Sequence, residues 1–244
     1  MRDWLNAIAA ASELPPDEAR DLDERGFVVM PGPVHSAEME RLAGAYDAAI
    51  ASATVDELKT GSTTTRVSDF VNRGADFDAL YIFPPLLAAC LRVIGRPFKL
   101  SSLHARTLRP RTAAQGLHVD VRSNSRDWPL AGFILMIDAF RPDNGATRFV
   151  PGSHQRLSGP EDTLSDRQSD HDGQVLACGP AGSLVVFNGS TWHEHSANTS
   201  DTPRRSIQGA FIPRDGHAAT DFAGRMHPET RTRLSPLARY VLAI

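Results

Sequence analysis

The sequence predicts a mostly β fold with flanking helices, and three observations favour an antiparallel double-sheet jelly roll. Short extended runs follow residue 98, turn signals separate these runs, and helical patterns are concentrated before that point. The turn signals include Asp143-Asn144-Gly145, Pro151-Gly152-Ser153 and Asn188-Gly189. At 244 residues with 41% hydrophobic content, the chain can bury one substantial core.

Three helices are expected ahead of most strands, because each segment carries start and stop signals. They cover residues 15–25, 36–50 and 84–95, with Ser36 as an N-cap and with Gly26 and Gly95 as stops. A short apolar strand is expected at residues 27–30. Further strands are expected at residues 100–108, 116–121, 133–140, 147–150, 174–177, 184–187, 191–195 and 206–212.

We expect a single domain over residues 1–244, with its core at about 25–214. Two polar segments without periodicity, at about 52–67 and 158–173, are expected to be rim loops. A closing helix is expected at residues 234–242, whereas residues 215–229 are predicted to be irregular.

Charge and cysteine content argue against several classes of function. The formal net charge of -3 gives no basic field for nucleic acid and no polybasic membrane patch. We therefore expect a small-molecule partner, no nucleic acid and no membrane, in a monomer or homodimer. Cys90 and Cys178 make neither a metal-binding spacing nor a disulfide framework, and no signal-peptide pattern is seen. These features predict a cytoplasmic protein.

His118 and Asp120 form a His-x-Asp pair, and His193 lies in the later segment Thr191-Trp192-His193-Glu194-His195. Alternate residues of a strand share a face, so the pair can hold one ion while His193 comes from another strand. Two imidazoles and one carboxylate leave other metal positions open, which suits non-haem Fe(II) and oxygen chemistry. Alone, a His-x-Asp triplet is weak evidence, because such triplets also arise by chance on surfaces.

A turn centred between Asn198 and Thr199 would make His193 and Arg204 cross-strand partners, about 5 Å apart on one face. Arg204 would then lie beside the metal, where a buried guanidinium requires an anion. Ser206, on the same face, could donate another hydrogen bond to that anion. The implied ligand is a small dicarboxylate that also chelates the iron. Arg205 is the alternative residue for binding this anion, but its opposite parity is expected to point it away from the metal.

Three parts of the chain together resemble the phytanoyl-CoA dioxygenase family. They are the His118-x-Asp120 pair, the segment from Gly145 to His154, and Trp192-His193 with the following Ser-Ala-Asn-Thr-Ser run. The resemblance, from about residue 25 to 214, implies an Fe(II)- and 2-oxoglutarate-dependent oxygenase on a double-stranded β-helix, a cupin-like jelly roll. By the same resemblance, His118, Asp120 and His193 would be the catalytic iron ligands. Arg204 would bind the distal carboxylate of 2-oxoglutarate.

The resemblance also implies a reaction, in which 2-oxoglutarate and O2 give succinate and CO2 while a substrate C–H bond is oxidised. Related halogenases carry a small residue in place of the carboxylate, so Asp120 favours hydroxylation or another oxidation. Gln115 and His104 are candidates to contact 2-oxoglutarate, and Ser206 belongs to the same group. Candidates for substrate contact are Arg66, Arg106, Arg122 and Trp128. The arginines favour an acidic substrate, although a solvated surface explains them at least as well.

Other residues and other classes of function have their own explanations. His195 shares the parity of His193 but lacks a preceding tryptophan, Glu194 is expected to be a solvated surface acid, and His154 a structural hydrogen-bonding residue. A cupin-type isomerase or hydrolase could use the same ligands with zinc or manganese and without 2-oxoglutarate. A catalytically silent binding module is the third class.

Overall fold

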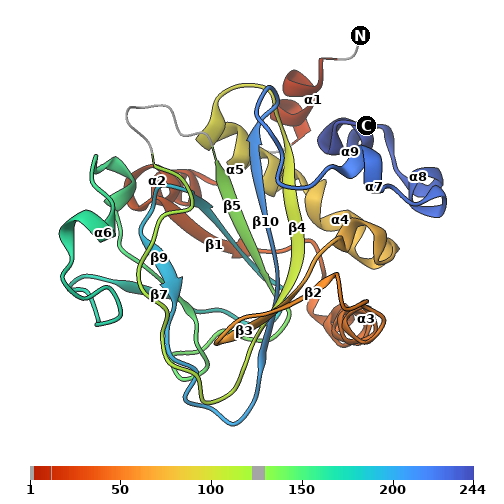
Figure 1. Cartoon of the computed structure of the whole chain (residues 1–244). Coiled ribbons are helices and arrows are strands. Elements are labelled where there is room, and N and C mark those ends of the chain that lie inside the picture. Colours follow the sequence, from red (N-terminus) through yellow and green to blue (C-terminus); the bar gives the residue numbers. More distant parts are fainter. Residues whose placement is uncertain (1–2, 12, 123–129) are drawn as a thin grey trace.

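The computed structural model describes residues 3–11, 13–122 and 130–244, and two antiparallel sheets form its centre (Figure 1). The large sheet has the strand order β1-β8-β5-β10-β4-β3-β2, and the small sheet has the order β7-β6-β9. The large sheet contains β1 (Phe27–Pro31), β2 (Leu58–Thr60), β3 (Thr64–Val67), β4 (Phe98–Leu108), β5 (Ala131–Met136), β8 (Ser183–Asn188) and β10 (Arg204–Pro213). The small sheet contains β6 (Thr147–Phe149), β7 (Val175–Ala177) and β9 (His193–His195). The predicted mostly β fold is confirmed.

Strand β10 lies between β4 and β5, and its register decides which side chains share a face. The matched pairs of β10 and β4 include Arg204 with Leu108, Ser206 with Arg106, and Gln208 with His104. Directly opposed residues project from one face, and so do alternate residues of one strand. All six side chains therefore lie on the same face of the large sheet.

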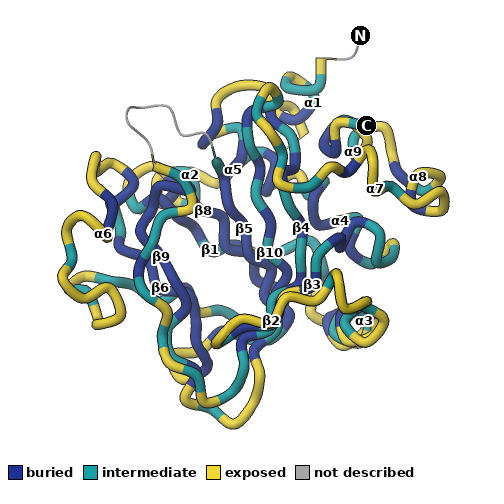
Figure 2. The backbone as a smooth tube through the Cα atoms, viewed as in Figure 1, coloured by how far each residue is buried: buried dark blue, intermediate teal, exposed yellow. Residues whose placement is uncertain are grey.

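Helices pack on the other side of the large sheet, and α1 and α9 lie near the two ends of the chain (Figure 1). Helix α5 (Pro84–Ile94) contacts β4, β5, β8 and β10, since Leu86, Leu87, Ala89 and Cys90 are buried at helical spacing. The other helices are α1 (Trp4–Ala11), α2 (Pro16–Arg25), α3 (Met39–Ala51), α4 (Asp78–Tyr81), α6 (Pro160–Thr163), α7 (Phe222–Arg225), α8 (Pro228–Arg233) and α9 (Pro236–Leu242). Figure 2 shows that the residues of the central strands are mostly buried, whereas many residues around α6 and α8 are exposed.

The stretch Ala75–Ile94 is long and apolar enough to cross a membrane by length and composition alone. The structure interrupts it between α4 and α5, where Pro84 begins the second helix. About 50% of its most apolar window is buried inside the protein, and α5 contacts the large sheet. These features are those of a core helix.

Several segments differ from the sequence-based predictions. Residues 215–229 are not wholly irregular, because α7 and the start of α8 lie within them, and the predicted rim loop 158–173 contains α6. Residues 52–67 are not only a loop, because β2 and β3 pair and continue the large sheet beyond β4, as threonine-rich segments favour. Residues 116–121 form no regular strand, and a single bridge joins His118 to His193. Ser36 begins a 3-10 helix rather than capping one, and the Nδ1 atom of His35 accepts the Ala37 N–H at its N-cap.

The two cysteines differ in access to solvent. Cys90 is buried and Cys178 is exposed, and burial raises the pKa of the Cys90 thiol. The thiolate is the reactive form, and the reagent must also reach it. We expect one of the 2 thiols to react with a disulfide reagent in the native protein, and both after unfolding. Cys178→Ser protein keeps only the Cys90 thiol, which is buried in α5. Rapid labelling of this variant in its native state would contradict the packing of α5.

Candidate metal centre

His118, Asp120 and His193 converge on one point. Each residue offers one ligand atom, and these atoms all lie within 4.8 Å of one another. The carboxylate oxygens of Asp120 lie 3.9 Å from His118 Nε2 and 3.8 Å from His193 Nε2. The backbone bridge between the two histidines brings their ring centroids to 4.6 Å. Two nitrogens and one oxygen in this arrangement match a donor set that suits Fe(II).

Backbone carbonyls orient both imidazoles. His118 Nδ1 lies 3.3 Å from the Gly116 carbonyl oxygen, and His193 Nδ1 lies 2.9 Å from that of Thr191. A carbonyl only accepts, so each Nδ1 carries the donated proton and each Nε2 keeps a free lone pair. Burial, followed by the neighbouring His193, lowers the pKa of His118 to about 4. His118 is therefore neutral near pH 7, as a metal ligand must be.

The three candidate ligands differ in burial. The His193 ring centroid lies 4.6 Å from that of Phe187 and 5.6 Å from that of Phe149. The His193 side chain is 8% exposed, compared with 31% for His118 and 36% for Asp120. One side of the site is thus closed by aromatic rings, and the other side is open where His118 and Asp120 lie.

Arg204 lines the same cavity as the three candidate ligands, which has a volume of about 270 Å³. Its Nη1 donates to the Gly145 carbonyl at 2.6 Å, and its guanidinium carbon lies 4.0 Å from the Phe140 ring centroid. Its Nε and Nη2 are buried and have no hydrogen-bond partner among the described residues. Burial lowers the pKa of Arg204 to about 9. A carboxylate would satisfy both free donors and compensate the buried charge, so the cavity fits 2-oxoglutarate.

Arg204 reaches the cavity by a different route from the predicted hairpin. His193 in β9 opposes Phe149 of the small sheet, whereas Arg204 in β10 opposes Leu108 of the large sheet. The prediction that His193 and Arg204 are cross-strand partners is therefore wrong. They meet because the two sheets face each other across the cavity. Arg205 points away, as its parity predicted, and forms an ion pair with Asp138.

The other candidates for 2-oxoglutarate contact occupy different places. The Ser206 hydroxyl is buried beside Arg204 and donates to the Arg106 carbonyl at 3.1 Å. His104 lines the cavity, and burial lowers its pKa to about 4, so it is neutral near pH 7. Gln115 is exposed and lines an outer hollow instead, where it accepts a hydrogen bond from Arg106. The predicted contact of Gln115 with 2-oxoglutarate is thus not supported by its position.

The substrate candidates divide in the same way. Arg66 and Arg106 line the cavity of the candidate ligands. Arg122 does not line it and instead forms exposed ion pairs with Glu161 and Asp162 at the rim, so its position gives no support to the predicted substrate contact. Trp128 lies outside the residues that the structure describes.

Glu194 is buried, although the sequence predicted a solvated acid. Its side chain is 0% exposed, and it accepts a hydrogen bond from Arg148 Nε at 3.1 Å. The other Arg148 nitrogens donate to the carbonyls of Arg167, Gln168 and Ser169. This pair joins the small sheet to the rim segment 158–173. Strand parity correctly placed the Glu194 side chain on the other face of β9 from that of His193. It could not reveal that the rim segment covers that face.

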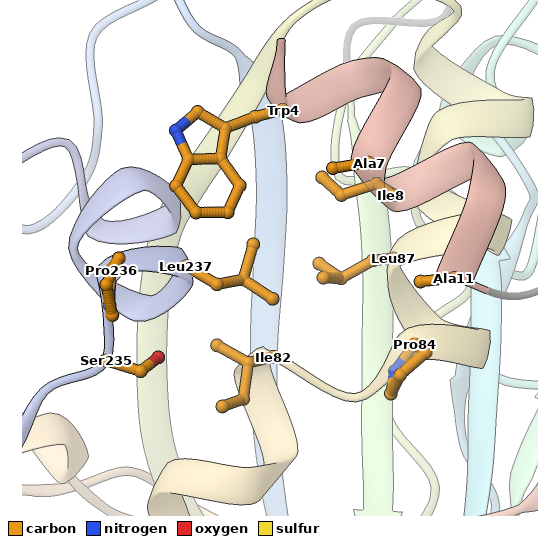
Figure 3. Close-up of a pocket in the computed structure, with 10 residues that line it drawn as sticks. All are labelled: Trp4, Ala7, Ile8, Ala11, Ile82, Pro84, Leu87, Ser235, Pro236 and Leu237. Atoms are coloured by element: carbon orange, nitrogen blue, oxygen red, sulfur yellow. The ribbon is translucent and has the colours of Figure 1, made fainter. Parts of the chain in front are cut away.

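A separate hollow of about 240 Å³ lies between α1, α5 and α9 (Figure 3). Trp4 and Ile8 of α1, Leu87 of α5 and Leu237 of α9 border it. Its described lining contains no histidine, cysteine, acid or base, and the Ser235 side chain is engaged as the N-cap of α9. This hollow therefore lacks the groups that catalysis requires.

Comparisons with known proteins agree with this geometry. The family model described as phytanoyl-CoA dioxygenase matches residues 22–206. An uncharacterised protein of Mycobacterium tuberculosis is 39% identical over 102 residues, which are 38% of this chain and 36% of that relative. The match thus spans about a third of that relative's length. Dioxygenase af480 of Aspergillus fumigatus is 24% identical over 242 residues, which are 93% of this chain and 76% of that protein.

The fold is shared with solved structures. HygX from Streptomyces hygroscopicus, crystallised with nickel and 2-oxoglutarate, matches with a TM-score of 0.67 at 15% identity, covering 84% of this chain and 90% of HygX. This similarity confirms the predicted jelly roll. The family match covers most of the 244 residues and includes the three candidate ligands and Arg204. The chain belongs to the phytanoyl-CoA dioxygenase family.

Proposed function

We propose that this protein is an Fe(II)- and 2-oxoglutarate-dependent dioxygenase that oxidises a C–H bond of a small molecule. One observation carries the proposal. A cluster of two imidazoles and one carboxylate shares a cavity with a buried arginine whose free donors lack a partner in the described part of the chain. Family membership supports the same reaction class.

Each residue has a defined part in this proposal. His118, Asp120 and His193 hold the iron from one side and leave its other positions open. When bound, iron and 2-oxoglutarate supply the oxidising chemistry with O2, giving succinate and CO2 as the substrate is oxidised. Arg204 binds the distal carboxylate and so orients 2-oxoglutarate. The rings of Phe149 and Phe187 exclude water behind His193.

The decisive experiment adds Fe(II) and 2-oxoglutarate to the protein without oxygen. Chelation of iron by the keto acid gives a visible charge-transfer band, which a zinc- or manganese-dependent isomerase or hydrolase would not need. A substrate screen scored by 2-oxoglutarate consumption and succinate release then tests turnover. Absence of the band at saturating iron and 2-oxoglutarate would refute the proposed function.

Arg204→Gln is expected to weaken 2-oxoglutarate binding by about 10- to 100-fold, the usual worth of hydrogen bonds to a charged group. The measurement is anaerobic titration of the charge-transfer band, with thermal unfolding recorded in parallel to check the fold. Arg122→Gln is the matched control, because Arg122 is exposed and paired at the rim. Equal 2-oxoglutarate affinities in the wild type and Arg204→Gln would contradict the assigned role.

We further propose a cytoplasmic monomer or homodimer of one domain, acting on an acidic small molecule without a nucleic-acid or membrane partner. The exposed free thiol of Cys178 supports a reducing compartment. The net charge of -3 supports the absence of a nucleic-acid partner. Size-exclusion chromatography with light scattering measures the oligomeric state.

A further inference from the structure

Two arginines stand at the junction of two hollows. Arg66 of β3 and Arg106 of β4 line the cavity of the candidate ligands and also an outer hollow of about 610 Å³. The described lining of the outer hollow includes a third cation, Lys59, and no aspartate or glutamate. The space next to the candidate metal centre is therefore positively charged.

The sheet register places the two guanidinium groups side by side. Arg66 and Arg106 are direct cross-strand partners, so their side chains leave the same face with Cβ atoms about 5 Å apart. Like charges placed directly opposite destabilise a sheet. Burial, followed by the charge of Arg66, lowers the pKa of Arg106 to about 10. The fold thus retains a repulsive pair at this position.

Neutral amides, rather than acids, orient Arg106. Its Nη1 donates to Gln208 Oε1 at 3.3 Å and its Nη2 to Gln115 Oε1 at 3.1 Å. Its Nε is buried and has no partner among the residues that the structure describes. These contacts fix the direction of the guanidinium without neutralising its charge.

In the proposed complex with Fe(II) and 2-oxoglutarate, the other charges balance one another without Arg66 and Arg106. The two positive charges of Fe(II) offset the two negative charges of 2-oxoglutarate, and Asp120 offsets Arg204. Glu194, the other acid in the described lining of the cavity, is paired with Arg148. Asp120 and Glu194 are the acids in the described lining whose charges act on Arg106, and each has another cation as its partner in this complex.

We infer that Arg66 and Arg106 form an anion subsite that binds a carboxylate or phosphate group of the substrate beside the metal centre. The inference rests on the proposed function, since it concerns the molecule that is oxidised. Two guanidinium groups offer paired N–H donors that match the oxygens of either anion. The outer hollow holds the rest of the molecule. The substrate class is therefore small organic acids or phosphate esters rather than neutral compounds.

The test uses protein loaded with Fe(II) and 2-oxoglutarate without oxygen, so that Arg204 is occupied and no turnover occurs. Inorganic phosphate and propanoate are titrated separately by calorimetry at constant ionic strength, which distinguishes a phosphate from a carboxylate preference. Saturable binding of at least one anion is expected in the wild type. Arg66→Gln and Arg106→Gln should each weaken it by about tenfold or more.

Arg111→Gln is the matched control, because Arg111 is exposed and pairs with Asp201 outside both hollows. Its anion affinity should equal that of the wild type. No saturable anion binding by the wild type, or an Arg66→Gln affinity equal to the wild-type value, overturns the subsite. The charge-transfer band is recorded on the same samples. A band that persists without anion binding refutes only the subsite, whereas a missing band refutes the proposed function.

Discussion

Asp120→Ala is expected to abolish succinate formation while the protein stays folded. The Asp120 carboxylate is the one anionic group in the candidate ligand set, and its oxygens approach both histidine Nε2 atoms within 4 Å. Losing a group that only supports a metal ligand costs about 10- to 100-fold in affinity or activity, so losing a ligand should cost at least about 100-fold. The side chain is 36% exposed, and a substitution there changes the unfolding free energy little.

Iron content, succinate release and thermal unfolding, measured on the same preparation, separate the chemical effect from a folding defect. Asp201→Ala is a suitable control, because Asp201 is an exposed acid that pairs with Arg111 and does not belong to the candidate ligand set. We expect wild-type iron content and turnover in that variant. Wild-type succinate formation by Asp120→Ala would remove Asp120 from the ligand set.

Features that depend on strand parity could be predicted from sequence. The face shared by Arg204, Ser206 and Gln208 follows from alternation along one strand, and the same rule directed Arg205 away. Gln208 lines the cavity and was missed, although that alternation could have identified it. His118 and Asp120 meet for the same local reason, even though their segment forms no regular strand.

Features that depend on pairing between distant segments could not be predicted in this way. The expected hairpin joined His193 to Arg204 because they are close in sequence, yet β9 and β10 belong to different sheets. A jelly roll sends successive strands to opposite sheets, so neighbours within a sheet come from distant parts of the chain. Arg148 gave no signal either, because the polar segment that covers it has no periodicity from which packing could be inferred.

Arg148→Met is expected to lower the free energy of unfolding by about 3–5 kcal/mol near pH 8, the usual cost of removing one partner of a buried ion pair. The Arg148 and Glu194 side chains are 1% and 0% exposed, so the remaining carboxylate cannot reach water. The rim segment also loses its anchor, and with it the bond from Leu117 N to Arg167 O that borders His118. We therefore expect lower iron occupancy as well, measured beside chemical denaturation.

The pH dependence distinguishes a charge effect from lost packing. Burial already raises the pKa of Glu194 to about 8, and removing Arg148, which lowers that pKa, must raise it further. A carboxyl group whose pKa is raised in the folded state destabilises the fold as the pH rises above its unfolded-state pKa. The loss of unfolding free energy in Arg148→Met should therefore be smaller at pH 5 than at pH 8.

Arg148→Met/Glu194→Gln should recover part of the stability that Arg148→Met loses, since the buried charge is gone. Arg141→Met, at an exposed pair with Asp143, should change stability by less than about 1 kcal/mol. If Arg148→Met and Arg141→Met lost equal unfolding free energy, or if the loss in Arg148→Met did not depend on pH, the Arg148–Glu194 charges would not hold the rim segment in place.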